Sequence, residues 1–450
     1  RSTLFPYTTL FRSTNRAGTA AINTILDQYP GNKVVVYDRN DNISFLGCGM
    51  ALWIGKQIPS GDGLFYSRKE DFEAKGAKVW METEVTAVDF DRKTITVRSG
   101  ANERQDTYDK LILATGSRPI ELPIPGADLK NIQYVKLYQN AKEVIEKLGN
   151  NDAFKTIAVV GAGYIGVELA EAFRRIGKTV ALVDLAPTVL VQYYDEPFRK
   201  RMIQNLEAHG IRLALGEKVL GYEGKDGNVS GVRTDKRMIP ADMVVQCVGF
   251  RPNTPFRHPA LKYHASGAYA VDRRQRTSIP DVYAIGDCAS VFDNASRRDE
   301  YIALATNAVR SGIIAAHNAC GTALEHIGVQ GSNGICVYDL KMVSTGLTVE
   351  RAERLGIPVE FTEFEDTQKP AFIQSANPVV RLRIVYRKDN REIIGAQMAS
   401  EYDMHMGIHM FSLAIEEHVT IDKLKLMDIF FLPHFNQPYN YITMAALSAK

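Results

Sequence analysis

The chain has few cysteines and no apolar segment long enough to cross a membrane. Its five cysteines (48, 247, 288, 320 and 336) form no CxxC pair and no cysteine/histidine cluster, which excludes a disulfide scaffold and a structural zinc site. No apolar run reaches the roughly eighteen residues of a membrane span. The N-terminus lacks the charged-then-apolar order of a signal peptide. We therefore expect a cytoplasmic protein that binds neither a membrane nor a metal.

The chain also carries little excess charge of either sign. Its 54 Lys and Arg side chains against 52 Asp and Glu give a formal net charge of +2, and 45% of its 450 residues are hydrophobic. This composition is typical of a globular enzyme with two or three domains. It produces no broad field that would attract nucleic acid, so we expect small-molecule partners.

The clearest motif is a glycine-rich turn between an apolar run, residues 157–160, and a helix predicted over residues 167–176. Gly161 permits the tight turn, Gly163 allows a pyrophosphate to approach the backbone, and Gly166 allows close packing of helix and strand. Asp184 ends the next predicted strand, 179–184, where a carboxylate accepts from a ribose 2′-hydroxyl and repels a 2′-phosphate. The motif predicts a dinucleotide site that favours NADH over NADPH.

A second unit of this kind is predicted near the N-terminus, although its first part is irregular. Asp38 ends a predicted strand twenty residues after Gly18, with a helix predicted over 17–29 between them. Residues 1–13 contain Pro6 and scattered polar residues, which make a poor buried parallel strand. They resemble translated adaptor or vector sequence that replaces a native strand and leaves Ser13 where the first glycine belongs; the alternative is a divergent strand around residues 10–11.

Cys48 follows the strand of this first unit and lies in the segment Ser44-Phe-Leu-Gly-Cys-Gly-Met-Ala-Leu-Trp-Ile-Gly55. Trp53 occupies the position of the second cysteine in a CxxxxC pair, so this disulfide cannot form. A redox-active Cys48 would have to cycle through a sulfenate or a mixed disulfide. The alternative is a small buried apolar residue, the common fate of a free cysteine.

Three further segments are informative. Residues 111–119 form an apolar strand that ends in a small-residue turn, where the chain can cross between domains. Residues 282–285 form a strand before Gly286 and Asp287, and this carboxylate is placed to bond a ribityl or phosphate group beside a helix predicted over 304–318. In the third part of the chain, we predict strands at 335–338, 379–386 and 393–398 and a helix at 348–355.

With these motifs the chain resembles the flavin-dependent pyridine nucleotide-disulfide oxidoreductases, in particular their single-cysteine branch of NADH oxidases, NADH peroxidases and coenzyme A disulfide reductases. The resemblance covers residues 14–450. The segments that carry it are residues 44–48, 114–116, 161–168, 249–253 and 286–287. The water-forming oxidases are favoured within this branch by residues 47–53, 305–312 and the aromatic tail 430–441.

The resemblance implies an α/β fold with two Rossmann-like domains, one for FAD and one for NAD, and a C-terminal α+β dimerisation domain. The predicted ranges are 1–119 with 243–326 for the FAD domain, 120–242 for the NAD domain and 327–450 for the dimerisation domain. FAD and NADH are the implied cofactors, O2 is the implied acceptor, and the implied assembly is a homodimer.

The resemblance and the motifs together define candidate site residues. For FAD they are Gly18, Asp38, Val85, Ala114, Thr115, Gly116, Ser117, Lys136, Asp287, Leu304, Ala305 and Thr306. For NADH they are Gly161, Gly163, Tyr164, Ile165, Gly166, Glu168, Asp184, Tyr193 and Gly249. The candidate catalytic residues are Cys48, Ser44 and Arg16. Ser44 is either a hydrogen-bond donor to the Cys48 thiolate or a turn residue.

By the same resemblance, Tyr164 covers the flavin until nicotinamide displaces it, and Glu168 orients the carboxamide. Arg16 stands where the family has a histidine, and a guanidinium cannot accept a proton, although its charge can favour a thiolate. Three other functions stay open: an NADH peroxidase, a coenzyme A disulfide reductase, and a nucleotide-binding flavoprotein without catalysis. The reductases usually have Asn-Cys, followed by Pro-Tyr, where this chain has Gly47-Cys48 and Leu52-Trp53.

Overall fold

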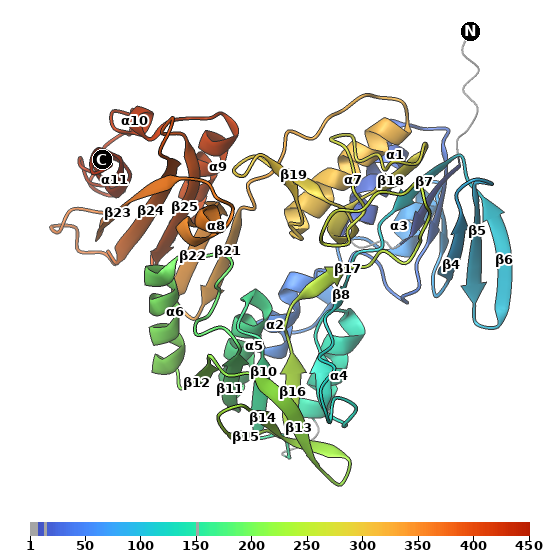
Figure 1. Ribbon diagram of the computed structural model, residues 1–450, viewed down its shortest axis with the longest axis horizontal. Helices are drawn as coiled ribbons and strands as arrows, with labels where there is room; N and C mark the ends of the chain where they lie inside the picture. The colour runs from blue at the N-terminus through green and yellow to red at the C-terminus, as the bar shows by residue number, and fades with distance from the viewer. Residues whose placement is uncertain (1–7, 13–15, 150–152) are drawn as a thin grey trace.

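The computed structural model describes residues 8–12, 16–149 and 153–450, which form three domains (Figure 1). The first domain is built on a parallel sheet in the order β18-β7-β1-β2-β3. Its strands are β18 (Val282–Ala284), β7 (Lys110–Leu113), β1 (Thr8–Arg12), β2 (Lys33–Tyr37) and β3 (Lys78–Trp80). Helices α1 (Arg16–Gln28) and α7 (Ala305–Ala319) pack on it through small residues such as Ala17, Ala21 and Ala315. A three-stranded sheet of β4 (Glu84–Asp89), β5 (Thr94–Ser99) and β6 (Asn102–Thr107) is attached.

The expectation of a poor strand at the N-terminus is wrong for residues 8–12. Their backbone forms β1, the central strand of the sheet, which pairs in parallel with β2 from Thr8↔Lys33 to Arg12↔Tyr37 and with β7 on its other side. Backbone pairing needs no particular side chain, and flanking strands rich in Val, Ile and Leu supply the register. Ser13 lies outside the described residues, and the foreign origin of residues 1–13 stays a prediction.

The second domain repeats this architecture. Its parallel sheet has the order β12-β11-β10-β16-β9, with β12 (Arg212–Leu215), β11 (Thr179–Asp184), β10 (Thr156–Val160), β16 (Met243–Gln246) and β9 (Ile132–Tyr134). Helix α5 (Tyr164–Arg175) joins β10 to β11, and α4 (Tyr138–Gly149) and α6 (Glu196–Ala208) flank the sheet (Figure 1). The antiparallel strands β13 (Val219–Lys225), β14 (Asn228–Thr234) and β15 (Met238–Pro240) complete the domain.

Two short strands mark where the chain passes between these domains. β8 (Ser117–Pro119) pairs antiparallel with β17 (Phe250–Pro252), so the outgoing and returning segments cross side by side. β16 still belongs to the second sheet, because it hydrogen-bonds to β10 and β9. The return to the first domain therefore follows residue 246, and the boundary predicted at 243 needs this adjustment.

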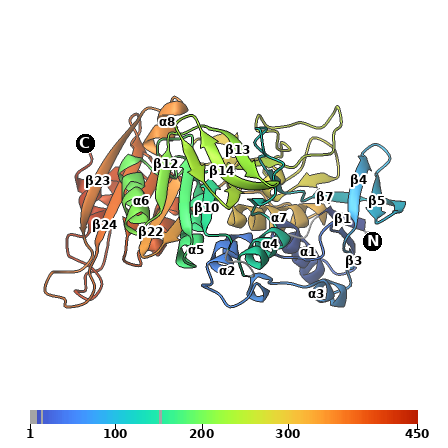
Figure 2. The ribbon, with the colours of Figure 1, turned by 90° about the horizontal axis from the view of Figure 1, so that it is seen from below.

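The third domain is an antiparallel sheet covered by helices. Its strand order is β21-β22-β25-β24-β23, with β21 (Asn333–Val337), β22 (Leu340–Gly346), β25 (Ile393–Ser400), β24 (Val379–Arg387) and β23 (Val359–Thr367). Helices α8 (Val349–Arg354), α9 (Ile408–Glu416), α10 (Ile421–Leu424) and α11 (Tyr441–Leu447) surround it, with Phe411 and Ala445 fully buried. Figure 2 shows this domain at one end of an elongated molecule, next to α6 of the second domain.

A buried polar network joins the second and third domains. Asp195, only 1% exposed, directly precedes α6, and Gln397 of β25 donates to its carboxylate over 2.6 Å. Arg383 of β24 lies 3.3 Å from the same carboxylate, and the backbone N–H of Val349 donates to it over 3.2 Å. Arg199 makes a bidentate pair with Glu350 beside it. Because buried charges are costly when unpaired, this network fixes the two domains to each other.

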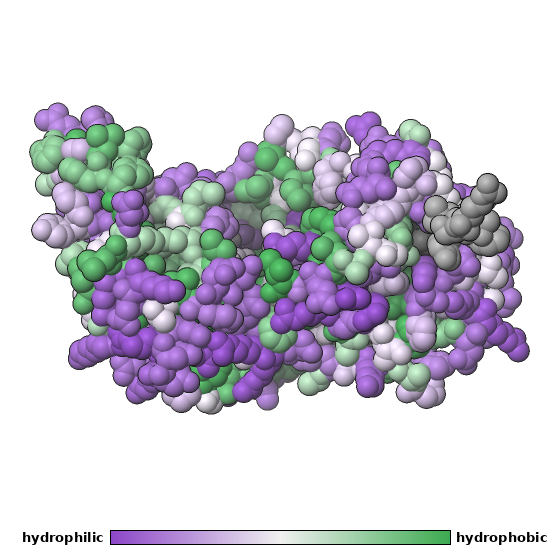
Figure 3. Space-filling view, turned by 90° about the horizontal axis from the view of Figure 1, so that it is seen from above, coloured by the Kyte–Doolittle hydropathy of each residue, from purple (hydrophilic) through white to green (hydrophobic). Residues whose placement is uncertain are grey.

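Apolar side chains are exposed on the third domain. Figure 3 shows them gathered on a lobe at the C-terminal-domain end of the molecule. Exposed apolar residues of the third domain include Phe372, between β23 and β24, and five residues between α10 and α11: Phe430, Phe431, Leu432, Phe435 and Tyr439. No helix among the described residues has the length and apolar character that a membrane crossing demands.

Candidate active site

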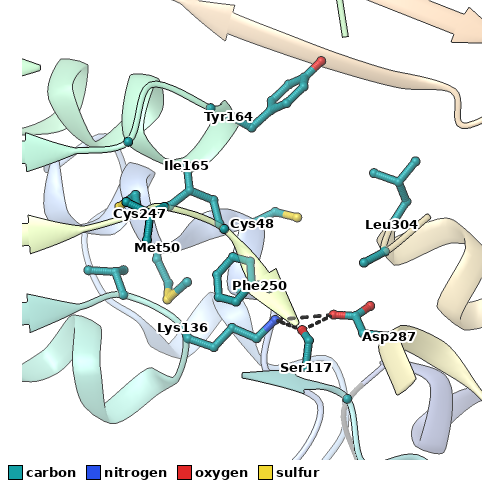
Figure 4. A pocket seen from close by; sticks show the side chains of 18 of the residues that line it. Cys48, Met50, Ser117, Lys136, Tyr164, Ile165, Cys247, Phe250, Asp287 and Leu304 are labelled. Atoms are coloured by element: carbon teal, nitrogen blue, oxygen red, sulfur yellow. Dashed lines mark hydrogen bonds and ion pairs between the residues drawn. The ribbon is translucent and has the colours of Figure 1, made fainter. Parts of the chain in front are cut away.

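One cavity of about 1040 Å³ lies where the three domains meet (Figure 4). The first domain contributes the start of α1, the end of β2 and the Cys48 loop. The second domain contributes the turn after β10 and the first half of α5, and the third contributes residues 332–334. The sheets of both nucleotide-binding units open onto this cavity at the carboxyl ends of their strands, the usual ligand side of such folds.

The cavity collects nearly all candidate site residues from distant parts of the chain. Two of them do not line it: Ser44 and Gly166. Those that do are Arg16, Gly18, Asp38, Cys48, Val85, Ala114, Thr115, Gly116, Ser117, Lys136, Gly161, Gly163, Tyr164, Ile165, Glu168, Asp184, Tyr193, Gly249, Asp287, Leu304, Ala305 and Thr306.

The first-domain side of the cavity is rich in groups that suit a flavin dinucleotide. Ser117 donates to Asp287 over 2.7 Å, and Lys136 donates to Ser117 over 2.8 Å and lies 3.4 Å from Asp287 (Figure 4). Lys136 also lies 4.3 Å from the centre of the Phe250 ring. The network holds one ammonium and one carboxylate on the cavity wall, where they can meet ring and ribityl polar atoms.

At its other end, the first-domain side of the cavity suits the adenosine and pyrophosphate parts of FAD. Asp38 follows β2, and its Oδ1 accepts from the N–H and the amide of Asn40, each over 2.9 Å. The first turns of α1 and α7 both face the cavity, and backbone N–H groups at helix N-termini bind phosphates. Hydroxyl-binding carboxylates, phosphate-binding helix ends and the Lys136 network together form a donor set that fits FAD.

The second glycine turn has the steric features that the motif requires. Gly161 has a φ of +110°, and a Cβ there would lie 2.4 Å from the carbonyl oxygen of Cys247. A Cβ on Gly166 would lie 1.8 Å from the carbonyl oxygen of Gly161. Gly166 is thus buried by the close packing of helix and turn, which explains why it does not line the cavity. A Cβ on Gly163 would meet no protein atom, so this side stays open to a ligand.

Asp184 closes the same turn from the next strand. Its Oδ2 accepts from the N–H of Ala162 over 2.5 Å, and its Oδ1 accepts from the N–H of Ala186 over 2.7 Å. The carboxylate is therefore oriented by the backbone while it lines the cavity. An oriented anion at this point accepts well from a ribose hydroxyl and opposes a second phosphate.

Cys48 lies on the cavity wall in a short 3₁₀ turn, Gly47–Gly49, that continues into α2 (Met50–Ile54). Its side chain is exposed and lies in the cavity beside Ile165 and above Phe250 in the view of Figure 4. An aromatic cluster anchors the loop behind it, because Trp53 stacks on Tyr138 with ring centres 5.3 Å apart and Phe45 meets Tyr138 edge-on at 5.5 Å. The alternative of a buried structural cysteine is wrong.

Ser44 does not contact the thiol as expected. Its hydroxyl donates to the carbonyl of Ser67 over 2.6 Å and accepts from the N–H groups of Ser67 and Tyr66 over 2.8 and 3.2 Å. The residue is 1% exposed and has a φ of +58°. These contacts tie the loop before Cys48 to residues 66–67, so Ser44 is a turn residue that supports the loop.

Tyr164 and Tyr193 form the second-domain wall with Glu168. The Tyr164 ring meets the Tyr193 ring edge-on with centres 4.4 Å apart. Burial, with a smaller contribution from Glu171, raises the pKa of Glu168 to about 7. A carboxyl group with this pKa changes its charge near neutral pH, which is unusual for an acid and typical of a functional site.

Several lining residues were not predicted. Cys247 is a second thiol on the cavity wall, and burial raises its pKa to about 12, so it stays protonated while Cys48 is exposed. Asn333 comes from the third domain, and no motif marks it. Phe250 lies inside the branch-specific segment 249–253, which was the available signal. Among the described residues, no group of His, Cys, Asp or Glu side chains is arranged to hold a metal.

Comparisons with known proteins agree with this geometry. The profile of the pyridine nucleotide-disulphide oxidoreductases matches residues 14–312, and the profile of their dimerisation domain matches residues 332–440. The chain is 59% identical to an NADH oxidase of Streptococcus pyogenes, over 97% of this chain and 98% of the relative. It is 50% identical to an NADH oxidase of Lactococcus lactis, with the same coverage of both chains.

A solved structure is similar over the whole chain as well. The water-forming NADH oxidase from Lactobacillus brevis, bound to NADH, superimposes with a TM-score of 0.95 at 37% identity and covers 98% of both chains. The two family profiles and these relatives confirm the α/β fold with two nucleotide-binding domains and a dimerisation domain. The chain belongs to the pyridine nucleotide-disulphide oxidoreductase family.

Proposed function

We propose that the protein is an FAD-dependent NADH oxidase that reduces O2 to water, with Cys48 as its redox thiol. The observation that carries this proposal is the exposed Cys48 sulfur on the wall of a cavity shared by both dinucleotide-binding units. The identity of 59% to an NADH oxidase over nearly the full chain, and the likeness to a water-forming NADH oxidase, support it.

In this proposal each unit of the chain binds one nucleotide. FAD, when bound, takes a hydride from NADH and passes electrons to the acceptor. Asp38, the helix ends of α1 and α7, and the network of Ser117, Lys136 and Asp287 hold FAD. The glycine turn at 161–166 and Asp184 hold the pyrophosphate and adenosine ribose of NADH, and Glu168 orients the nicotinamide carboxamide.

The role of Cys48 is to complete the reduction of oxygen. Two electrons convert O2 to hydrogen peroxide, and the Cys48 thiolate attacks one peroxide oxygen, so that the O–O bond breaks, a sulfenate forms and hydroxide leaves as water. Two electrons from a second NADH, with two protons, then convert the sulfenic acid to thiol and water. The sum is one O2 and two NADH, with two protons, to two waters and two NAD⁺.

Arg16 lines the same cavity. A guanidinium cannot relay a proton, so in this proposal position 16 supplies neither the acid nor the base of the cycle. The protons for the cycle then come from solvent or from another group in the cavity, and Glu168, with a pKa of about 7, is the candidate with suitable acidity.

The Cys48→Ser variant tests the proposal. We expect it to consume O2 and NADH in equal amounts and to release H2O2, whereas the wild-type protein consumes one O2 for two NADH and releases none. Cys336→Ser, which removes another exposed thiol that does not line the cavity, serves as the matched control and should behave as wild type. Water formation that persists in Cys48→Ser would exclude the sulfenate cycle.

The same assay separates the other functions that this branch allows. An absence of oxygen uptake, combined with rapid NADH oxidation on addition of H2O2 or of coenzyme A disulfide, would replace the oxidase with a peroxidase or a reductase. Loss of all NADH oxidation with any acceptor would leave a non-catalytic flavoprotein.

The proposed assembly is a homodimer in the cytoplasm. The match to a dimerisation domain at residues 332–440 and the exposed apolar residues of its lobe, such as Phe430 and Tyr439, support a second copy as the partner. The free cysteines fit a reducing compartment. Sedimentation of the holoenzyme checks the assembly, and a monomer at micromolar concentration would contradict it.

A further inference from the structure

The Tyr164 side chain contacts both its own domain and the third domain. It is the first residue of α5, directly after Gly163, and its ring lines the cavity. Its hydroxyl donates to Oδ1 of Asn333, the first residue of β21 in the third domain, and lies 2.9 Å from the hydroxyl of Tyr194. Figure 4 shows this hydroxyl end turned away from Cys48. The ring therefore bridges two domains at the edge of the proposed NADH site.

Two other hydrogen bonds orient the Asn333 carboxamide so that its oxygen can accept from Tyr164. Its amide nitrogen donates to the carbonyl of Gly331 over 2.7 Å, so its Oδ1 must face the other way, and the hydroxyl of Ser344 donates to this oxygen over 3.1 Å. Asn333 itself lines the cavity. A carboxamide fixed from both ends costs little further ordering when it accepts from Tyr164.

The position of the Tyr164 ring decides how much room remains along α5. Ile165 and Glu168 of the same helix line the cavity, and Cys48 lies beyond Ile165 (Figure 4). Rotation of Tyr164 about its Cα–Cβ bond exchanges staggered positions of the ring. Without Asn333 the Tyr164 hydroxyl keeps its contact with Tyr194 of the same domain but loses its bond to the third domain, so the ring can turn toward this space.

We propose that Asn333 is a positioning residue that holds the Tyr164 ring against the third domain and so keeps the nicotinamide end of the NADH site open. This inference rests on the proposed function, because it takes NADH as the ligand of this half of the cavity. Asn333 acts through Tyr164 and contacts no reacting atom.

The Asn333→Ala holoenzyme tests this role. With the acceptor gone, NADH must displace the ring, so we expect the KM for NADH and the dissociation constant of NAD⁺, titrated by flavin absorbance, to rise about fivefold, as for the loss of one ordinary hydrogen bond. We expect kcat to change less than twofold. Flavin emission should fall, because a tyrosine ring that reaches the flavin quenches it.

Asn205→Ala is the matched control. It makes the same truncation on α6 and removes a single interdomain hydrogen bond to the far end of β21, from Asn205 to the carbonyl of Val337 over 3.0 Å. This variant should keep the wild-type KM and emission. An equal rise in KM for Asn205→Ala would show general loosening between domains and overturn the positioning role.

Tyr164→Phe removes the same bond from the other side, together with the contact to Tyr194, and should raise KM at least as much as Asn333→Ala does. The double variant should add little to the Tyr164→Phe change, because Tyr164→Phe already lacks the interaction that Asn333→Ala removes. Additive effects, or a wild-type KM in Asn333→Ala, would overturn the proposal. If the wild-type protein fails to oxidise NADH, the proposed function fails; normal wild-type turnover with an unaffected Asn333→Ala variant refutes the Asn333 role alone.

Discussion

The two nucleotide-binding units share an architecture but differ in the turn that meets the ligand. Each has a central strand, a helix after it and a second strand with an aspartate at or directly after its end: β1, α1 and Asp38 in the first, and β10, α5 and Asp184 in the second. The third residue of each helix is glycine, Gly18 or Gly166. The first unit, however, has Arg16 where the second has Tyr164.

The comparison shows that the two units can share a fold although the residues that face the ligand differ. Parallel pairing on both sides of β1 and the packing of α1 on α7 suffice for the sheet, even with an irregular N-terminal sequence. Ligand binding depends on single positions at the turns, because one added Cβ or one changed charge there alters the affinity for the nucleotide. We therefore expect substitutions in the turns to change binding far more than they change folding.

The largest effect is expected for Gly161→Ala, which breaks the second turn. The added Cβ would lie 2.4 Å from the Cys247 carbonyl at a φ of +110°, and relief of a clash of this kind costs about 3 kcal/mol, so kcat/KM for NADH should fall about 100-fold. FAD content should stay at the wild-type value. Gly163→Ala is the control, because its Cβ meets no protein atom, and any loss there reports on the nucleotide alone.

The acids of the two units can be compared directly. Asp184→Ala removes the proposed ribose acceptor and two bonds to backbone N–H groups, so the KM for NADH should rise about tenfold and the preference for NADH over NADPH should shrink. Asp38→Ala should instead lower FAD content at an unchanged KM for NADH. The comparison fails if both variants lose the same cofactor, as judged by flavin absorbance and steady-state kinetics.

A smaller effect, on the pH profile of NADH oxidation, is expected for Arg16→His, which changes the first residue of α1. A histidine at this position titrates near pH 6.5, whereas arginine does not titrate in the working range. The pH profile of NADH oxidation should gain an inflection near this value, and the rate above it should change modestly. A profile identical to wild type would show that position 16 does not contribute to proton transfer.

The smallest effect is a stability change at Glu168. Burial raises its folded pKa from 4.5 to about 7, so the folded state prefers the neutral acid: that preference stabilises fully below pH 4.5 and is lost as pH rises through 7. Glu168→Gln should therefore be more stable than wild type at pH 8 by about 1–3 kcal/mol and equally stable at pH 4. Thermal unfolding at both pH values measures the difference, and a pH-independent shift would contradict it.

Local patterns of the sequence predict much of the fold. The strand predicted over 179–184 is β11, and the helices predicted over 167–176 and 304–318 correspond to α5 and α7 with shifts at their ends. Glycine spacing also predicted the tight second turn, because the steric demands at Gly161 and Gly166 are local to a few residues.

The remaining features depend on contacts between distant segments. Asn333 reaches Tyr164 across 169 positions of the chain, and nothing in its own neighbourhood indicates this. The sequence left Ser44 either as a donor to the Cys48 thiolate or as a turn residue, and the contacts that decide for the turn come from the distant residues 66–67. Cys247 reaches the cavity only through the placement of β16 beside β10. Proximity in sequence is a poor guide where loops from several domains meet.

The buried network around Asp195 limits how this chain can be divided. Its partners Gln397 and Arg383 belong to the third domain, and Arg383 is paired on its other side with Glu363 over 2.7 Å. A nucleotide-binding half expressed without residues beyond 326 would expose the Asp195 side chain and the apolar face of α6 to water, while Arg383 of the severed sheet would lose Asp195 and keep Glu363. Domain swaps between relatives should accordingly take α6, β24 and β25 from the same parent, and truncations should keep them together.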